Sequence, residues 1–413
     1  MGSTSVFEWS TLEKDANGRP GPAQLRRLQD VEACGVSLSS PVALFSYHIN
    51  LHVLRLQDGS VRIVSRSAES DPSQSQAALL PGLLEDFQVT SMTEGGGGLI
   101  AFVSVDGALA LAYFGYEEKQ QFSPFVNAQR AALLHLPPGV KAVKAACADY
   151  MVAVQAEDGR MFTVGFNAFG QLGAGGCWAL KSRGLFGCLA HYLSCAWCVC
   201  CPHWSPYSLR PVLVEGALRG RKVVSVSTGS EHFVAVDSEG GVFSWGRGGP
   251  WLGLGRRTRF TGGPVGVHRR ADADARREVW SAADKPMRIQ GGDLGEGRCV
   301  RCFAGGHGSA CLTERGDLLT WGRGAATFGD EFELPHLDSR FNEVVGGRGV
   351  REFALSDRNA ALLLEDDRVL HWNDQHGYDV FQLGRGDGSS GIVSVSVDDY
   401  SGFIVKKTQT QSD

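Results

Sequence analysis

A cysteine-rich segment at residues 177–208 holds the densest group of metal-ligating side chains in the chain. The candidate ligands are Cys188, His191, Cys195, Cys198, Cys200, Cys201 and His203. Thiolates and imidazoles are ligands that zinc prefers, and Cys188-x-x-His191 with Cys195-x-x-Cys198 is the best pairing. Structural zinc sites usually separate two such pairs by a longer loop. Because the candidate ligands are crowded together, we interpret residues 177–208 as translated intron sequence, with a genuine insertion as the alternative. We therefore expect no metal and no cofactor.

A second long interval, at residues 256–297, opens with a basic run. Its arginines are Arg256, Arg257, Arg259, Arg269, Arg270, Arg276 and Arg277. Against Asp272 and Asp274, these seven arginines leave a balance of +5. Such a loop could contact nucleic-acid phosphates or an acidic protein partner. It lacks the interleaved aromatic residues that base stacking requires, so a solvated loop is the alternative.

No catalytic constellation is visible elsewhere. The sequence has no Walker loop, no serine nucleophile elbow and no zinc-hydrolase helix. We therefore expect no hydrolase or transferase site and no catalytic residue of that kind.

Composition narrows the setting. The net charge of −5 implies no bulk attraction to nucleic acid or to an anionic membrane. No apolar run approaches the roughly 20 residues of a membrane span. Eleven cysteines, an odd number, fit a reducing compartment. No secretory or mitochondrial presequence is evident. We expect a monomeric protein of the cytoplasm and/or nucleus, not bound to membrane.

The elements that must position these residues are short strands. Residues 223–255 predict three strands with period-2 alternation, bounded by glycine. Gly240 precedes Gly246 by six residues, and the same step recurs along the chain. The six turn positions are 59, 107, 159, 240, 316 and 367. A single three-strand unit cannot bury its own faces, so six copies indicate a repeat architecture.

Two further patterns accompany the repeat. Gly170-Gln171-Leu172-Gly173 follows one third strand, and similar signatures occur at residues 251–255 and 381–386. Trp245, Trp321 and Trp372 occupy equivalent third-strand positions, which predicts core side chains rather than a ligand-stacking site.

A seventh copy is divided between the two ends of the sequence. Residues 392–407 match the first two strands of the unit, and residues 5–10 resemble its third. Pairing them in one sheet would protect strand edges that otherwise promote aggregation. We therefore predict an all-β fold, a seven-bladed β-propeller closed by its terminal strands. It would form one domain over residues 1–413, with insertions at 177–208 and 256–297.

Units such as HFVAVDSEGGVFSWG and MVAVQAEDGRMFTVGFNAFGQLGAG resemble the regulator of chromosome condensation repeat. The resemblance covers nearly the whole chain outside the two insertions. It implies a seven-bladed propeller with four-stranded blades. Members of that family include exchange factors for the Ran GTPase that dock on nucleosomes, and binding modules in ubiquitin ligases and membrane-traffic factors. Fold alone does not choose among these functions.

The resemblance also implies a partner-binding face. The family's first-to-second-strand loop carries a structural histidine, matched here by His232, preceded by an outward-pointing residue. The outward positions are Asn50, Gly98, Tyr150, Glu231, His307, Arg358 and Tyr400, with Asp149, Asp398 and Asp399 adding acidity. Tyrosine and arginine are favoured at protein interfaces. Ordinary loop residues without a partner are the alternative.

Two functions follow as hypotheses. The first is a non-enzymatic scaffold or adaptor that binds a protein partner through these loops and the arginine-rich insertion. The second is a guanine-nucleotide exchange factor for a Ran-like small GTPase, with docking on chromatin or nucleic acid. Exchange requires tighter binding of the nucleotide-free state, and the sequence offers acids but no identifiable wedge for that purpose.

Overall fold

The computed structural model describes residues 3–10, 24–27, 43–46, 51–56, 58–65, 76–80, 87–95, 99–113, 131–148, 150–167, 170–175, 207–255, 282–295, 297–327, 330–337, 342–343, 345, 349–373, 377–382, 390–397 and 401–408. None of the helices in these segments is long and apolar enough to cross a membrane.

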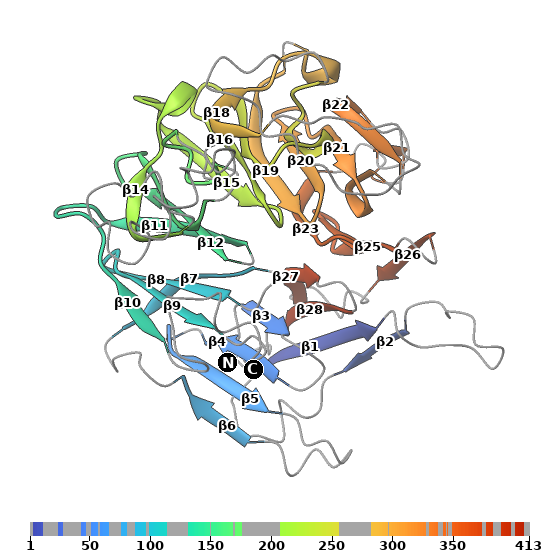
Figure 1. Cartoon of the computed structure of the whole chain (residues 1–413). Coiled ribbons are helices and arrows are strands. Elements are labelled where there is room, and N and C mark those ends of the chain that lie inside the picture. The colour runs from blue at the N-terminus through green and yellow to red at the C-terminus, as the bar shows by residue number, and fades with distance from the viewer. Residues whose placement is uncertain are drawn as a thin grey trace, which may run out of the picture.

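The described residues form four-stranded antiparallel sheets (Figure 1). The first two sheets of consecutive strands hold β3 (Ala43–Ser46), β4 (Leu51–Arg55), β5 (Val61–Ser65) and β6 (Gln76–Leu79), then β7 (Val89–Glu94), β8 (Leu99–Ser104), β9 (Leu109–Tyr113) and β10 (Ala132–Leu134). The next two hold β11 (Ala142–Ala148), β12 (Met151–Ala156), β13 (Met161–Phe166) and β14 (Tyr207–Leu213), then β15 (Val223–Thr228), β16 (His232–Asp237), β17 (Val242–Gly246) and β18 (Ala283–Arg288).

The following two sheets hold β19 (Cys299–Gly305), β20 (Gly308–Thr313), β21 (Leu318–Arg323) and β22 (Glu331–Leu337), then β23 (Val350–Leu355), β24 (Asn359–Leu364), β25 (Arg368–Asn373) and β26 (Gly377–Gln382). A composite sheet has the order β2-β1-β28-β27, with β1 (Ser3–Ser10), β2 (Gln24–Arg27), β27 (Ser390–Val397) and β28 (Ser401–Thr408). Short 3-10 turns are η3 (Gly216–Leu218), η4 (Pro250–Leu252), η5 (Gly292–Leu294) and η6 (Ala325–Thr327).

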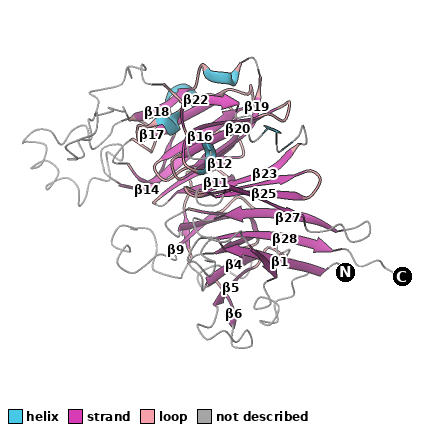
Figure 2. Cartoon of the chain, turned by 90° about the vertical axis from the view of Figure 1, so that its right-hand side faces the viewer, coloured by secondary structure: helices cyan, strands magenta, loops and turns pink. Residues whose placement is uncertain are grey.

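The sheets are arranged radially. The first strands lie toward the middle of the molecule and the fourth strands at its periphery (Figure 1), and the view from the side shows neighbouring sheets stacked on one another (Figure 2). The all-β propeller class is therefore confirmed. The structure describes most side chains of the five sheets from β7 to β26. These five sheets are the blades that the structure shows.

The turns between second and third strands follow the sequence pattern closely. All six predicted turn positions have positive φ, from +82° at Gly59 to +88° at Gly316, with Asp367 at +62°. Asp367 is the one non-glycine residue of the described chain in this left-handed region, which glycine enters without strain. The repeat spacing was thus a correct guide to the hairpins of all six units.

The structure corrects several predicted boundaries. The repeat unit has a fourth strand that the three-strand pattern missed. Part of the predicted second insertion is ordinary blade, because β18 pairs with β17 and η5 follows it. Tyr207 and Ser208, assigned to the first insertion, belong to β14, and Phe381 and Gln382, assigned to a signature loop, belong to β26. The composite sheet also contains β2, paired with β1, which lies beyond the predicted segment 5–10.

Residues 177–206 of the cysteine-rich segment and residues 256–281 of the arginine-rich segment lie outside the described residues. The predictions made for them stay predictions.

Tryptophan side chains tie neighbouring blades together. Trp245 and Trp321 have no exposed surface and Trp372 is 8% exposed, which confirms their predicted core positions. The Trp245 indole Nε1 donates to the carbonyl of Gln171, 2.9 Å away, in the signature loop of the preceding blade. Trp321 Nε1 donates in the same way to the carbonyl of Trp251, at 2.8 Å. The signature loop therefore supplies a backbone acceptor to the next blade.

Each first strand is hydrogen-bonded to another strand along one edge only, so backbone groups at its other edge have no partner strand. Neighbouring first strands satisfy part of the free edge with side chains. Ser225 Oγ accepts from the backbone N–H of Cys302 at 3.1 Å, and Ser227 Oγ accepts from that of Ala304 at 2.9 Å. Glu352 Oε2 accepts from the N–H of Val395 at 3.1 Å. These bonds hold consecutive blades in register where apolar packing alone would let them slide.

The indole hydrogen bonds predict a graded response to Trp→Phe substitution. Trp245→Phe should lower the free energy of unfolding by about 1–3 kcal/mol more than Trp9→Phe, because it removes the donor to a buried carbonyl. Trp9 is equally buried, and its Nε1 has no hydrogen-bond partner among the described residues, so it controls for the lost ring volume. Urea unfolding of both variants would measure the difference, and equal losses would contradict the prediction.

Candidate partner-binding face

Four of the predicted face residues are described, and they lie in equivalent loops of successive blades. Tyr150, Glu231, His307 and Arg358 each fall between the first and second strands of their sheet. The first three are half-buried, and Arg358 is exposed. Because the strands are antiparallel, these loops share one side of the propeller with the connections from third to fourth strands.

The other predicted face residues cannot be placed. Asn50, Gly98, Asp149, Asp398, Asp399 and Tyr400 lie outside the described residues, as do all seven arginines from Arg256 to Arg277. Among the described residues, no group of three or more His, Cys, Asp or Glu side chains could hold a metal ion.

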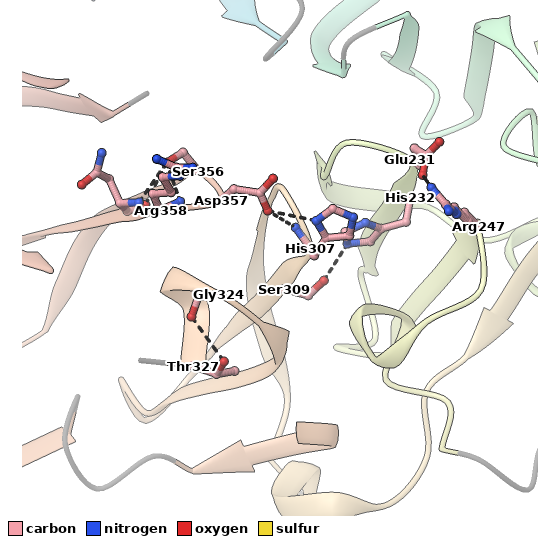
Figure 3. A network of polar contacts seen from close by, with 11 residues as sticks. Glu231, His232, Arg247, His307, Ser309, Gly324, Thr327, Ser356, Asp357 and Arg358 are labelled. Atoms are coloured by element: carbon pink, nitrogen blue, oxygen red, sulfur yellow. Dashed lines mark hydrogen bonds and ion pairs between the residues drawn. The ribbon is translucent and has the colours of Figure 1, made fainter. Parts of the chain in front are cut away.

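His307 is fixed by the next blade. Its backbone N–H donates to Asp357 Oδ1 at 2.8 Å, and its Nδ1 lies 3.0 Å from the same oxygen (Figure 3). Gly306 makes this approach possible, since a Cβ there would meet Asp357 Oδ1 at 1.8 Å. Burial alone would raise the pKa of Asp357, but the hydrogen bond and charge of His307, with the charge of Arg323, hold it below its usual value. The carboxylate is therefore kept ionised beside the imidazole.

Trp251 lies at the centre of this group. Its ring stands edge-on to His307, with centroids 4.7 Å apart, and the Arg323 guanidinium carbon lies 5.3 Å from its ring centroid. Trp251 Nε1 donates to the carbonyl of Arg247 at 2.9 Å. A cation over an indole face is attracted by the ring quadrupole, so Arg323 is held where it also faces Asp357.

Glu231 is paired within its own blade. Its carboxylate forms an ion pair with Arg247, and the Arg247 N–H donates to the Glu231 carbonyl at 3.0 Å (Figure 3). Both side chains are partly exposed, so the pair contributes little to stability and mainly sets the direction of the two groups.

Below the surface, His232 is a structural residue, as the resemblance implies. It is buried, and its Nε2 lies 2.8 Å from Ser309 Oγ. The Ser309 hydroxyl donates its one proton to the carbonyl of Trp251 at 2.9 Å, so His232 must donate through Nε2. Burial first, and the charge of His307 second, lower the pKa of His232 from 6.5 to about 3. The imidazole is therefore neutral at physiological pH.

Arg358 presents the most open charge of the row. The turn before β24 is held by Ser356, whose Oγ accepts from the N–H of Asn359 at 3.0 Å. Arg358 has no ion-pair partner among the described residues, so its charge is available to a ligand.

Sequence reasoning missed four members of this group: Arg247, Trp251, Arg323 and Asp357. Trp251 had been noted only as part of a signature loop. Asp357 is the residue before a predicted face position, and its contact with His307 spans 50 positions in sequence, which no local pattern reveals.

Fold and loops together define a repeat propeller with a polar loop face. Residues 223–249 match the family described as Regulator of chromosome condensation (RCC1) repeat. E3 ubiquitin-protein ligase HERC2 of Homo sapiens is 28% identical over 259 residues, 62% of this chain and 4% of that protein. Secretion-regulating guanine nucleotide exchange factor of Mus musculus is 27% identical over 248 residues, 59% of this chain and 43% of that protein. The chain thus spans less than half the length of either relative.

Solved structures agree on the fold. Human WBSCR16 superposes with a TM-score of 0.64 at 16% identity, covering 99% of this chain and 100% of that one. Prp20p from Saccharomyces cerevisiae, described with its binding to Gsp1p and histones, has a TM-score of 0.63 at 14% identity, covering 99% and 92%. Taken together, the matched repeat and the superpositions make the chain similar to RCC1-repeat propellers.

The buried histidine predicts an acid-labile fold. His232 charges near pH 6.5 when the chain is unfolded but only near pH 3 when it is folded. Its neutral state thus contributes fully above pH 6.5, and stability is lost as the pH falls from there toward 3. Between pH 7 and pH 5, the wild type should lose about 2 kcal/mol more of its free energy of unfolding than His232→Asn does.

Asparagine suits this test because Asn359 occupies the same first position of β24. Urea unfolding at several pH values would give both curves. Parallel curves for wild type and variant would show that His232 does not cause the pH dependence.

Proposed function

We propose that this chain is a protein-binding propeller scaffold whose first-to-second-strand loops contact a protein partner. The observation that carries the proposal is the row formed by Tyr150, Glu231, His307 and Arg358 in consecutive blades. Glu231 and His307 are held by Arg247 and Asp357, so binding would cost little side-chain entropy. A preorganised row of aromatic, acidic and basic groups suits a polar protein surface better than a small ligand.

The scaffold would be a ring of seven blades in one domain. Support comes from contacts between adjacent sheets: β23 and β24 pack against β27, and β27 and β28 lie against β3. Val53 and Val61 share an apolar cluster with Ile100 and Phe102, which joins the β3–β6 and β7–β10 sheets. The register Ser3↔Thr408 to Ser10↔Ser401 between β1 and β28 supports closure through the composite sheet.

Nucleotide exchange on a small GTPase is the second candidate. It is favoured by the likeness to the secretion-regulating guanine nucleotide exchange factor and to Prp20p, which binds Gsp1p and histones. A chromatin-associated partner, or nucleic acid at the arginine-rich segment, belongs to the same alternative. A cytoplasmic or nuclear setting and a monomeric state complete the proposal.

The scaffold proposal predicts that charge reversal on the loop face abolishes partner capture. We expect His307→Ala with Arg358→Glu to lower the yield of specific partners from cytoplasmic and nuclear extracts at least tenfold. The purified partner should lose affinity to a similar extent, as for central interface residues. Arg219→Glu, an exposed change after η3 on the opposite side, is the matched control.

Nucleotide release separates the two candidates. Purified small GTPases loaded with a fluorescent GDP analogue should release it at the same rate with and without the chain. Acceleration that Arg358→Glu removes would make exchange the function and the scaffold proposal wrong. Equal capture by the loop-face variant and wild type would refute the assignment of this face.

A further inference from the structure

Six first strands share a β-bulge near their beginning. The register shifts fall at Val89/Ser91, Ala142/Lys144, Val223/Ser225, Cys299/Arg301, Val350/Glu352 and Ile392/Ser394. A bulge leaves one residue out of the ladder and redirects its side chain. Recurrence at one position in six strands marks it as a built feature of the ring.

In three consecutive blades the extra residue is a valine with open surface. Val143, Val224 and Val300 are 44%, 41% and 37% exposed. Both faces of each of these first strands pack on neighbouring sheets, and the outer edge is hydrogen-bonded to the second strand. The exposed valine side chains therefore lie at the inner rim of the propeller. We name them the valine arc. It lies at the end of the first strands opposite the loop face, because the loops follow the other end of each strand.

Basic side chains flank each valine. Lys141 and Lys144 stand beside Val143, Lys222 precedes Val224, and Arg298 and Arg301 stand beside Val300. This arrangement is basic-x-Val in all three blades, followed by a further cation in two of them.

Most of these cations lack a partner that neutralises them. The side-chain ammonium groups of Lys141, Lys144 and Lys222 have no hydrogen bond or ion pair with the described residues. Arg301 donates to the carbonyl of Arg351 at 2.5 Å, whereas Arg298 is paired with Glu314 at 3.3 Å.

The acids on this side are mostly engaged. Glu239 is paired with Arg221, and Asp158 with Arg160. Asp106 is held by the Ser104 hydroxyl, and Glu157 is exposed. Glu352 faces Lys144 and Arg301 across the rim while accepting the Val395 N–H. The ammonium groups of Lys144 and Lys222 therefore stand beside the valine arc without an ion-pair partner among the described residues.

Lys144 is one of these unpaired cations. Burial is the main cause that lowers its pKa, and the charge of Arg301 adds to the effect, against the opposing influences of Cys302 and Glu352. An anion bound beside Lys144 would offset the effect of Arg301.

We propose that the valine arc and its flanking cations bind an acidic, apolar-anchored segment of a protein partner. Apolar side chains of the segment would cover the three valines, and its carboxylates would reach Lys144, Lys222 and Arg301. The valines favour a protein over nucleic acid, because the arc has no aromatic side chain on which bases could stack. The site is independent of the loop face, so either assignment can fail alone.

Selection from a randomised dodecapeptide phage library on the purified full chain tests the proposal. We expect enriched peptides to combine apolar residues with Asp or Glu. The synthesised peptide should bind Val224→Asp and Lys144→Glu at least tenfold more weakly than wild type, and more weakly at high salt. Val380→Asp, at a 46% exposed position on the outer strand β26, should bind within twofold of wild type.

Unfolding curves would confirm that all three variants are folded. Two rim variants of different chemistry keep the test valid if one of them folds poorly. Failure to enrich any sequence, enrichment of peptides without acidic residues, or equal affinity for rim and control variants would each overturn the proposal. Competition by inorganic phosphate alone, without dependence on Val224, would reduce the site to a simple anion site and also contradict it.

Discussion

Each first strand of this propeller has one edge without a partner strand, and the organisation of the ring depends on how that edge is satisfied. A free edge exposes backbone groups that pair readily with another chain. Here Ser225, Ser227 and Glu352 reach across to the backbone of the next first strand. These bonds fix the angle between blades, and they do so without a continuous β-ladder through the middle of the ring. Apolar clusters between adjacent sheets then supply most of the stabilisation.

The same edge explains why the two sides of the propeller differ. On the loop side, polar residues are locked to one another, as His307 is to Asp357 and Glu231 is to Arg247. On the opposite side, bulges turn Val143, Val224 and Val300 out of the ladder, next to the cations that flank them in sequence. One side thus offers preorganised hydrogen-bonding groups, and the other offers apolar surface surrounded by unpaired charge. The two proposed binding sites therefore lie on opposite sides of the propeller and differ in chemistry.

Much of the fold could be predicted from the sequence because its hairpins are local. The turn at Gly240 and the alternation on either side of it depend on residues within a short window. The resemblance implied a fourth strand in each blade, but the residue pattern did not locate it, because these strands are partly exposed and follow no alternation, as in β18 and β22. The loop face was located by spacing, but Asp357 and Arg323 were not, since their roles arise from contacts between blades. Insertion boundaries failed for a related reason: β18 follows a long segment, and only its pairing with β17 identifies it.

The pairing of β1 with β28 has a consequence for how the molecule is made. β1 is synthesised long before its partner β28, because the strands of six other sheets lie between them in sequence. Contacts between segments so distant in sequence form slowly, because closing a long loop costs entropy before the contact repays it. The nascent chain must therefore keep β1 from pairing elsewhere while the hairpins of the other sheets assemble in order. The composite sheet therefore cannot form until the strands between β1 and β28 have been translated.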